Sequence, residues 1–159
     1  MDYTGSNGEF YATVTDPNGN RTVNVTDVLD HKVRVLQESK NPIRCTDTSI
    51  IAGNWCTTSM TYDAAGRLKT VTDAASPANM TTITYDSIGR RTHLTDPDMG
   101  SWDYDYDDNG NLTFQKDANG KVTNMFYDPL NRITRKDLFP TGQTAGPEDT
   151  TYSYDGDPP

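Results

Sequence analysis

The residues of this chain that could carry chemistry are mainly acidic, because Asp and Glu number 23 while there are only two histidines. The segment Asp105-x-Asp107-x-Asn109-Gly110 has the alternating oxygen ligands of the first half of a calcium-binding loop. The twelfth position of such a loop is a bidentate glutamate, but here it is Lys116. We therefore expect no metal ligands and interpret the segment as a tight turn.

Groups for acid–base or nucleophilic catalysis are sparse. His31 and His93 are isolated from each other and lie in different sequence contexts, which does not indicate a proton-transfer pair. The chain contains neither a Gly-x-Ser-x-Gly elbow nor a phosphate-binding loop. We expect no catalytic residue and no cofactor, and hence a protein that is not an enzyme.

The two cysteines, Cys45 and Cys56, lie close together in a stretch that matches no other part of the chain. In an oxidising compartment they would form a disulfide that closes a short loop, worth about 2–3 kcal/mol. Two inert thiols are the alternative, and without paired histidines the cysteines make no zinc site.

The bulk charge excludes several partners. The net charge is -9 and the pI about 4.5, whereas nucleic acids and anionic membrane surfaces attract clustered Lys and Arg. No apolar run reaches the length of a membrane-spanning helix. We expect no nucleic-acid binding and no membrane insertion.

The aspartates belong to a repeat. A Tyr-Asp pair recurs five times at intervals of about 21 to 27 residues, which indicates one structural unit stacked repeatedly. The pairs are Tyr62-Asp63, Tyr85-Asp86, Tyr106-Asp107, Tyr127-Asp128 and Tyr154-Asp155. Four of them are followed by a turn signature, whose further residues are Gly66, Arg67, Gly89, Arg90, Gly110 and Arg132. At Asn131 the glycine is replaced by the residue that next best tolerates a positive φ.

Each repeat contains two turns separated by short runs with strand character. The runs 68–72 and 80–85 are rich in threonine and alternate in polarity, as strands do. Two strands between tight turns form a hairpin, and successive hairpins form an antiparallel meander that twists and curls. Only 33% of the residues are hydrophobic, but nine are tyrosines. The sequence therefore predicts an all-β fold of consecutive antiparallel β-hairpins in a curved repeat sheet, without helices and without a large aliphatic core.

Within this single repeat array we predict four parts. Residues 1–36 are degenerate repeats, in which 27–33 parallels 128–133 with Thr26 in the tyrosine position. Residues 37–60 form a non-repeat loop with the two cysteines. Residues 61–139 are well-formed repeats, and residues 140–159 are a loop followed by a truncated repeat.

The side chains of the repeat have two expected roles. The tyrosine rings stack as a ladder, one per hairpin, and supply most of the packing. Asp63 pairs with Arg67 across its turn, and Asp86 with Arg90, unless these residues are simply solvated. Replacement of Tyr85 or Tyr106 is then expected to cost more stability than replacement of Asp86.

The segments Tyr62-Asp63-Ala64-Ala65-Gly66-Arg67 and Tyr85-Asp86-Ser87-Ile88-Gly89-Arg90 resemble the core motif of the Rhs repeat, also called the YD repeat. The resemblance is strong over about residues 60–137 and weak over 10–36. It implies hairpins in a long spiralling sheet, which in large members of the family wraps into a hollow shell. Such shells occur in insecticidal toxin complexes, bacterial polymorphic toxins and the teneurins, and they are containers rather than catalysts.

Two functions follow from these expectations. In the first, which we favour, the chain is an extracellular structural protein whose open sheet edges pair with other copies into a fibre or surface scaffold. In the second, it is a segment of the shell of a secreted toxin or adhesion protein that encloses a C-terminal cargo domain. Covalent glycans are compatible with either function, because Asn20, Asn24, Asn79 and Asn111 lie in Asn-x-Thr sequons.

Overall fold

The computed structural model describes residues 8–39, 55–74, 79–142 and 148–154, and these residues form twelve β-strands without a helix. The prediction of an all-β fold is therefore confirmed. The strands are β1 (Phe10–Thr15), β2 (Arg21–Thr26), β3 (Lys32–Glu38), β4 (Trp55–Tyr62), β5 (Leu68–Thr72), β6 (Met80–Tyr85), β7 (Arg91–Asp96), β8 (Gly100–Tyr106), β9 (Leu112–Lys116), β10 (Val122–Tyr127), β11 (Ile133–Phe139) and β12 (Glu148–Thr151). Among the described residues, no helix suited to crossing a membrane is found.

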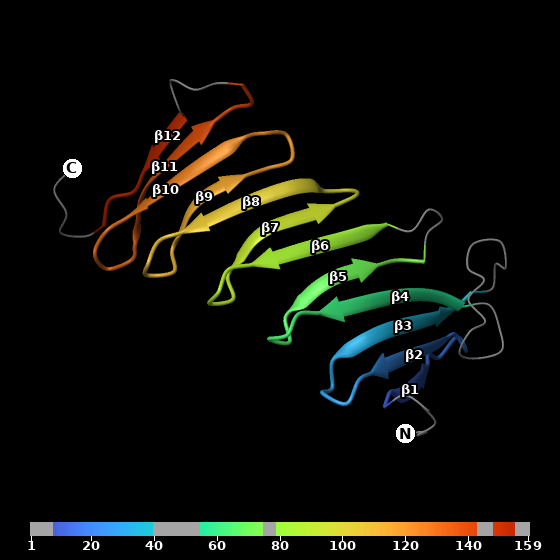
Figure 1. Cartoon of the computed structure of the whole chain (residues 1–159). Coiled ribbons are helices and arrows are strands. Elements are labelled where there is room, and N and C mark those ends of the chain that lie inside the picture. Colours follow the sequence, from blue (N-terminus) through green and yellow to red (C-terminus); the bar gives the residue numbers. More distant parts are fainter. Residues whose placement is uncertain (1–7, 40–54, 75–78, 143–147, 155–159) are drawn as a thin grey trace. The chain divides into compact units, whose positions relative to one another are not determined.

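The chain divides into two compact units, Met1–Thr82 and Ile83–Pro159. Within each unit every strand pairs antiparallel with its neighbours in sequence, as in a meander of hairpins (Figure 1). Strands β5 and β6 coincide with the runs 68–72 and 80–85 that the polarity pattern predicts. Local alternation was sufficient here because both strands lie between turns with strong sequence signatures.

In four hairpins the pairing register shifts by one residue next to the tyrosine position. The shifts fall between Val25 and Thr26, Thr61 and Tyr62, Asp105 and Tyr106, and Phe126 and Tyr127. In each case the strand after the turn holds the extra residue, which is a β-bulge. A bulge increases the local right-handed twist, so these four hairpins twist more strongly where the chain leaves the turn.

The predicted loop at 37–60 is too long at both ends. Strand β3 continues to Glu38 and β4 begins at Trp55, and these two residues lie opposite each other in the sheet. The ends of β3 and β4 are set by the pairing of these two strands, and the local sequence pattern does not show which distant segments pair. Cys56 therefore lies in β4, where it is a disulfide-bonded cysteine. Cys45 lies outside the described residues, so its pairing with Cys56 stays a prediction.

The buried side chains correct the expectation that tyrosines replace an aliphatic core. In the first unit Val23, Val25, Leu36 and Trp55 are at most 1% exposed and form one cluster, with Val23 directly opposite Leu36. In the second unit the buried hydrophobic residues of the described part are Leu94, Tyr104 and Met125. The five tyrosines of the Tyr-Asp pairs are only half-buried. Side chains that lie opposite each other on neighbouring strands pack together, so a few apolar residues can form a core even in a polar chain.

Candidate functional site

Asp63 organises its turn through three hydrogen bonds. One carboxylate oxygen, Oδ1, accepts from the backbone N–H groups of Ala65 (2.9 Å) and Arg67 (3.0 Å), while Oδ2 accepts from Nε of Arg67 (2.7 Å). The backbone N–H of Gly66 donates to the carbonyl of Asp63 at 3.0 Å. Gly66 has φ of 77°, which turns the chain so that the backbone N–H of Asp63 donates to the carbonyl of Arg67 at 2.9 Å, and this φ costs other residues energy.

The same arrangement recurs at Asp86 and Asp128, whose carboxylates bind the side chains of Arg90 and Arg132, both at 2.6 Å. Asp107 binds the amide of Asn111 instead, at 2.8 Å. Asp27 binds the His31 ring at 3.1 Å, so His31 occupies the arginine position of a degenerate repeat. Below, the aspartate is called position 1 of the turn and its side-chain partner position 5.

These bonds stabilise the charged carboxylates. The pKa of Asp63 is lowered, chiefly by the backbone N–H of Arg67, although partial desolvation acts against the shift. The pKa of Asp107 is lowered, chiefly by the Asn111 amide. For Asp86 and Asp128 desolvation is the largest single influence and raises the pKa, but the hydrogen bonds and charge of the position-5 arginine, together with the backbone N–H of Ile88 or Leu130, outweigh it and the net shift is downward.

The residue at position 5 also contacts the following turn. Arg90 lies over the ring of Tyr106, 4.9 Å from its centroid, and its Nη1 donates to the backbone carbonyl of Asp107 at 2.7 Å. Arg132 lies 4.3 Å from the ring of Tyr154. In the first unit the His31 ring stacks on Tyr62, with centroids 4.6 Å apart and planes inclined by 17°.

These contacts correct the expectation of a tyrosine ladder. Equivalent tyrosines of successive hairpins are separated by two strand spacings, about 10 Å, which is too far for direct ring stacking. A guanidinium from position 5 lies against the rings of Tyr106 and Tyr154 instead, which is a cation–π contact, and the His31 imidazole stacks on the ring of Tyr62.

The hydroxyl groups of four repeat tyrosines each form a further hydrogen bond within their hairpin. Each hydroxyl donates to the backbone carbonyl of the first residue of the preceding odd-numbered strand. The bonds are Tyr62 to Lys32 (2.8 Å), Tyr106 to Arg91 (3.0 Å), Tyr127 to Leu112 (2.9 Å) and Tyr154 to Ile133 (2.8 Å). Sequence reasoning missed this role because the acceptor is a main-chain atom, which any residue type supplies.

We call the described turns 27–31 and 63–67 of the first unit, and 86–90, 107–111 and 128–132 of the second, the Tyr-Asp turn row. In each unit taken alone, these turns join an even-numbered to an odd-numbered strand and lie at one end of the strands (Figure 1). The aspartate of every turn in the row is bound to its own turn. The carboxylates of the row therefore stabilise the turns, which is a structural role.

Three of the four sequon asparagines are turn residues. The side-chain amide of Asn20 donates to Asp16 (2.7 Å), that of Asn79 to Asp73 (3.2 Å), and that of Asn111 to both Asp107 and Asn131. Asn24 lies in β2 between two buried valines. Whether any of them carries a glycan stays a prediction.

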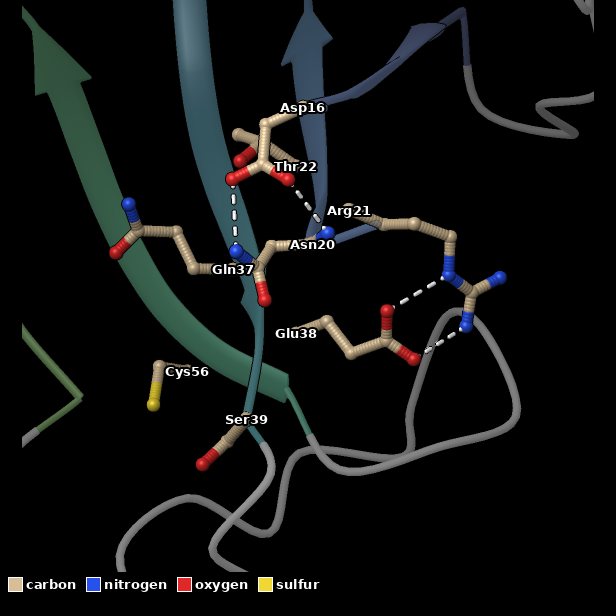
Figure 2. Close-up of a pocket in the computed structure, with 8 residues that line it drawn as sticks. All are labelled: Asp16, Asn20, Arg21, Thr22, Gln37, Glu38, Ser39 and Cys56. Carbon is tan, nitrogen blue, oxygen red and sulfur yellow. Dashed lines mark hydrogen bonds and ion pairs between the residues drawn. The ribbon is translucent and has the colours of Figure 1, made fainter. Parts of the chain in front are cut away.

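A pocket of about 540 Å³ opens beside the start of β2 (Figure 2). It is lined by Asp16, Asn20, Arg21, Thr22, Gln37, Glu38, Ser39 and Cys56. Its charged groups already bind protein partners: Arg21 forms a two-point ion pair with Glu38 (2.8 and 2.6 Å), and Asp16 binds Asn20. Such a lining offers a ligand little uncompensated charge.

One polar cluster was not anticipated from the sequence. His93 Nδ1 lies 2.6 Å from Asp103, and His93 Nε2 lies 2.9 Å from the Thr95 hydroxyl and 3.3 Å from that of Ser101. Strand pairing assembles this cluster, since His93 lies opposite Asp103 and Thr95 opposite Ser101. The side chains of His93 and Asp103 are 38% and 48% exposed, so the cluster lies on an open sheet face and not in a substrate pocket. Among the described residues, no group of three or more His, Cys, Asp or Glu is arranged to hold a metal ion.

The family model of the teneurin YD-shell matches residues 11–157 of the chain. The comparison with curated proteins finds no match.

Solved structures resemble the chain in fold. The crystal structure of TcdB2-TccC3 is 18% identical with a TM-score of 0.59, over 93% of this chain and 9% of that one. The same complex without its hypervariable C-terminal region is 21% identical with a TM-score of 0.59, over 86% and 7%. The Tc holotoxin pore of Photorhabdus luminescens is 18% identical with a TM-score of 0.63, over 83% and 6%. The chain therefore spans less than a tenth of each structure.

Proposed function

Because the chain belongs to the teneurin YD-shell family, we propose that it forms a strip of the wall of a larger YD-repeat shell. The observation that carries the proposal is the coupling of successive hairpins by the Tyr-Asp turn row. Arg90 binds its own turn through Asp86 and the next turn through the Asp107 carbonyl. A hairpin linked in this way to its successor suits a continuous wall of many repeats.

The share of the matched structures that the chain covers, 6–9%, also supports a wall strip. A shell of that size requires many more repeats than this chain contains. In this proposal the strip contributes to a container that encloses a folded or toxic cargo, and the protein is secreted or displayed at the cell surface. Its role is mechanical and non-enzymatic, and its partners are the neighbouring repeats.

A self-assembling fibre is the second candidate. It is favoured by the outer strands β1 and β12, whose pairing partners within the described residues lie on one side only. Unpaired strand edges invite pairing with another chain. The same edges serve a shell equally well, because further repeats of one protein would extend them, and the comparisons favour the shell.

Electron microscopy of the native protein tests the proposal. A hollow particle containing density inside a β-sheet wall is expected. Filaments with one chain per axial step would favour the fibre, and a small solitary particle would contradict both functions.

A further inference from the structure

Strands β7 and β8 bring four polar side chains together on one face of their hairpin. His93 lies opposite Asp103 in the register and Thr95 lies opposite Ser101, and residues two apart on a strand share a face. All four residues belong to the second unit. Thr95 and Ser101 are exposed, while His93 and Asp103 are partly exposed, so the cluster is open to solvent.

Asp103 fixes the orientation and the tautomer of the His93 ring. Its carboxylate oxygen Oδ1 lies 2.6 Å from Nδ1 of the ring. An ionised carboxylate only accepts hydrogen bonds, so Nδ1 carries the hydrogen of this bond. In the neutral imidazole the other ring nitrogen, Nε2, then has no hydrogen and is a base.

This base lies within reach of two hydroxyl groups. Nε2 of His93 is 2.9 Å from Oγ1 of Thr95 and 3.3 Å from Oγ of Ser101, and the two oxygens are 3.4 Å apart. Because Nε2 has a single lone pair, the shorter distance assigns its hydrogen bond to Thr95. A hydroxyl that donates to a base, which a third group holds in place, is the arrangement that activates a nucleophile.

Two other pairs of threonine hydroxyls provide a comparison within the chain. The Oγ1 atoms of Thr61 and Thr70 lie 2.6 Å apart, and those of Thr84 and Thr92 lie 3.3 Å apart. Such pairs on neighbouring strands stabilise a threonine-rich sheet by themselves. In the β7–β8 cluster the hydroxyl pair is joined by an imidazole and its carboxylate, which packing of the sheet does not require.

We propose that this cluster is an acyl-acceptor site, in which His93 removes the proton of the Thr95 hydroxyl while its oxygen attacks an activated ester or thioester. The new bond joins Oγ1 of Thr95 to the acyl carbon. The bond from that carbon to the alcohol or thiol breaks, and His93 passes the proton to this leaving group. The donor approaches the open face from solvent, and each chain accepts one acyl group without turnover. The site does not depend on the proposed wall function.

Acetylation of the chain by p-nitrophenyl acetate tests the proposal, with intact-mass measurement and peptide mapping to locate the acetyl groups. We expect Thr95 to be acetylated faster than Thr84 or Thr61. His93→Gln keeps a polar side chain but removes the base, and should lower the rate at Thr95 about 100-fold or more. Thr95→Ser should still be acetylated at this position, whereas Thr95→Val should not. Acetylation of the lysines, which needs no neighbouring base, measures the reagent in every sample.

The matched control is His31→Gln. His31 also lies beside a carboxylate, that of Asp27 at 3.1 Å, but its ring is stacked on Tyr62. This variant should acetylate Thr95 at the wild-type rate, and circular dichroism establishes that each variant retains the sheet. The proposal is overturned if Thr95 reacts no faster than Thr84, or equally fast without His93. Acetylation of Ser101 in place of Thr95 overturns the choice of nucleophile.

Asp103 is a positioning residue in this proposal, because it acts on the donor only through His93. In Asp103→Asn the side-chain amide can donate to Nδ1, which moves the ring hydrogen to Nε2 and occupies the base. The rate at Thr95 should then fall about tenfold or more. Nitrogen NMR of the His93 ring should show the hydrogen on Nδ1 in the wild type and on Nε2 in the variant. A slower reaction with an unchanged tautomer would contradict the positioning role.

Discussion

The contact between Arg90 and Tyr106 provides the sharpest test of turn-to-turn coupling. The guanidinium lies 4.9 Å from the ring centroid, and both residues belong to the second unit. A partly exposed cation–π contact of this kind is worth about 0.5–1 kcal/mol. The Tyr106 hydroxyl makes a separate bond to the Arg91 carbonyl, worth about 0.5–1.5 kcal/mol.

Two substitutions at Tyr106 separate the contribution of the ring contact from that of the hydroxyl bond. Tyr106→Phe removes the hydroxyl and keeps the ring, so we expect a loss of about 0.5–1.5 kcal/mol that does not depend on Arg90. Tyr106→Leu removes the ring as well. In a double-mutant cycle with Arg90→Ala, Tyr106→Leu should show a coupling energy of about 0.5–1 kcal/mol, whereas Tyr106→Phe should show much less.

Urea unfolding followed by circular dichroism measures each free energy of unfolding. The matched control is the cycle of Arg90→Ala with Tyr127→Leu, because Tyr127 belongs to the following turn and should be additive within about 0.3–0.5 kcal/mol. If the Arg90–Tyr106 coupling is no larger than this control, the stacking contributes nothing to stability. Coupling of this turn to the next would then rest on the hydrogen bond from Arg90 to the Asp107 carbonyl.

Three further predictions concern individual turns. A Cβ atom at Gly100 would lie 2.4 Å from the Cβ of Ala118, whereas nothing lies within 4 Å of one at Gly110. Both glycines have positive φ, so Gly100→Ala should lower the thermal midpoint clearly more than Gly110→Ala; equal effects would contradict the close approach. Asp30 has φ of 65° where three equivalent turns have glycine, and Asp30→Gly should stabilise the chain by up to about 1 kcal/mol in urea unfolding, while a destabilised variant would refute backbone strain. The pKa of Asp63 is lowered by folding, so its contribution to stability is complete above the ordinary value of about 3.9 and is lost as the pH falls through the folded value. The difference in urea midpoint between the wild type and Asp63→Asn should therefore shrink on acidification below about pH 4, and a constant difference would exclude the carboxylate's charge as its cause.

Much of the local structure could be predicted from the residue types. Asp and Gly at fixed separation specify a turn through their own backbone preferences, so the turn at Asp63–Arg67 needs no distant information. The replacement of glycine by Asn131 was interpreted as a positive-φ position, and its φ of 60° agrees with this. The strands between such turns follow, because their lengths are set by the turns that bound them.

The parts that could not be predicted depend on contacts across strands. The ends of β3 and β4 are decided by the pairing of Glu38 with Trp55, residues far apart in the chain. The cluster around His93 exists because register brings Asp103 opposite it. The stacking of Arg90 on Tyr106 likewise joins two hairpins whose separation only the folded sheet defines.

The sequence by itself thus determined the repeating unit, since each aspartate and glycine acts on the backbone within four residues of its own position. Tertiary structure alone decided how one hairpin repeat contacts the next. It placed the cation of one turn against the tyrosine of the following one, because two strand spacings separate tyrosines that would otherwise have stacked directly. It also left Leu29, Ile88 and Leu130 in solvent, since their backbone N–H groups are held inward by the aspartates of the repeat.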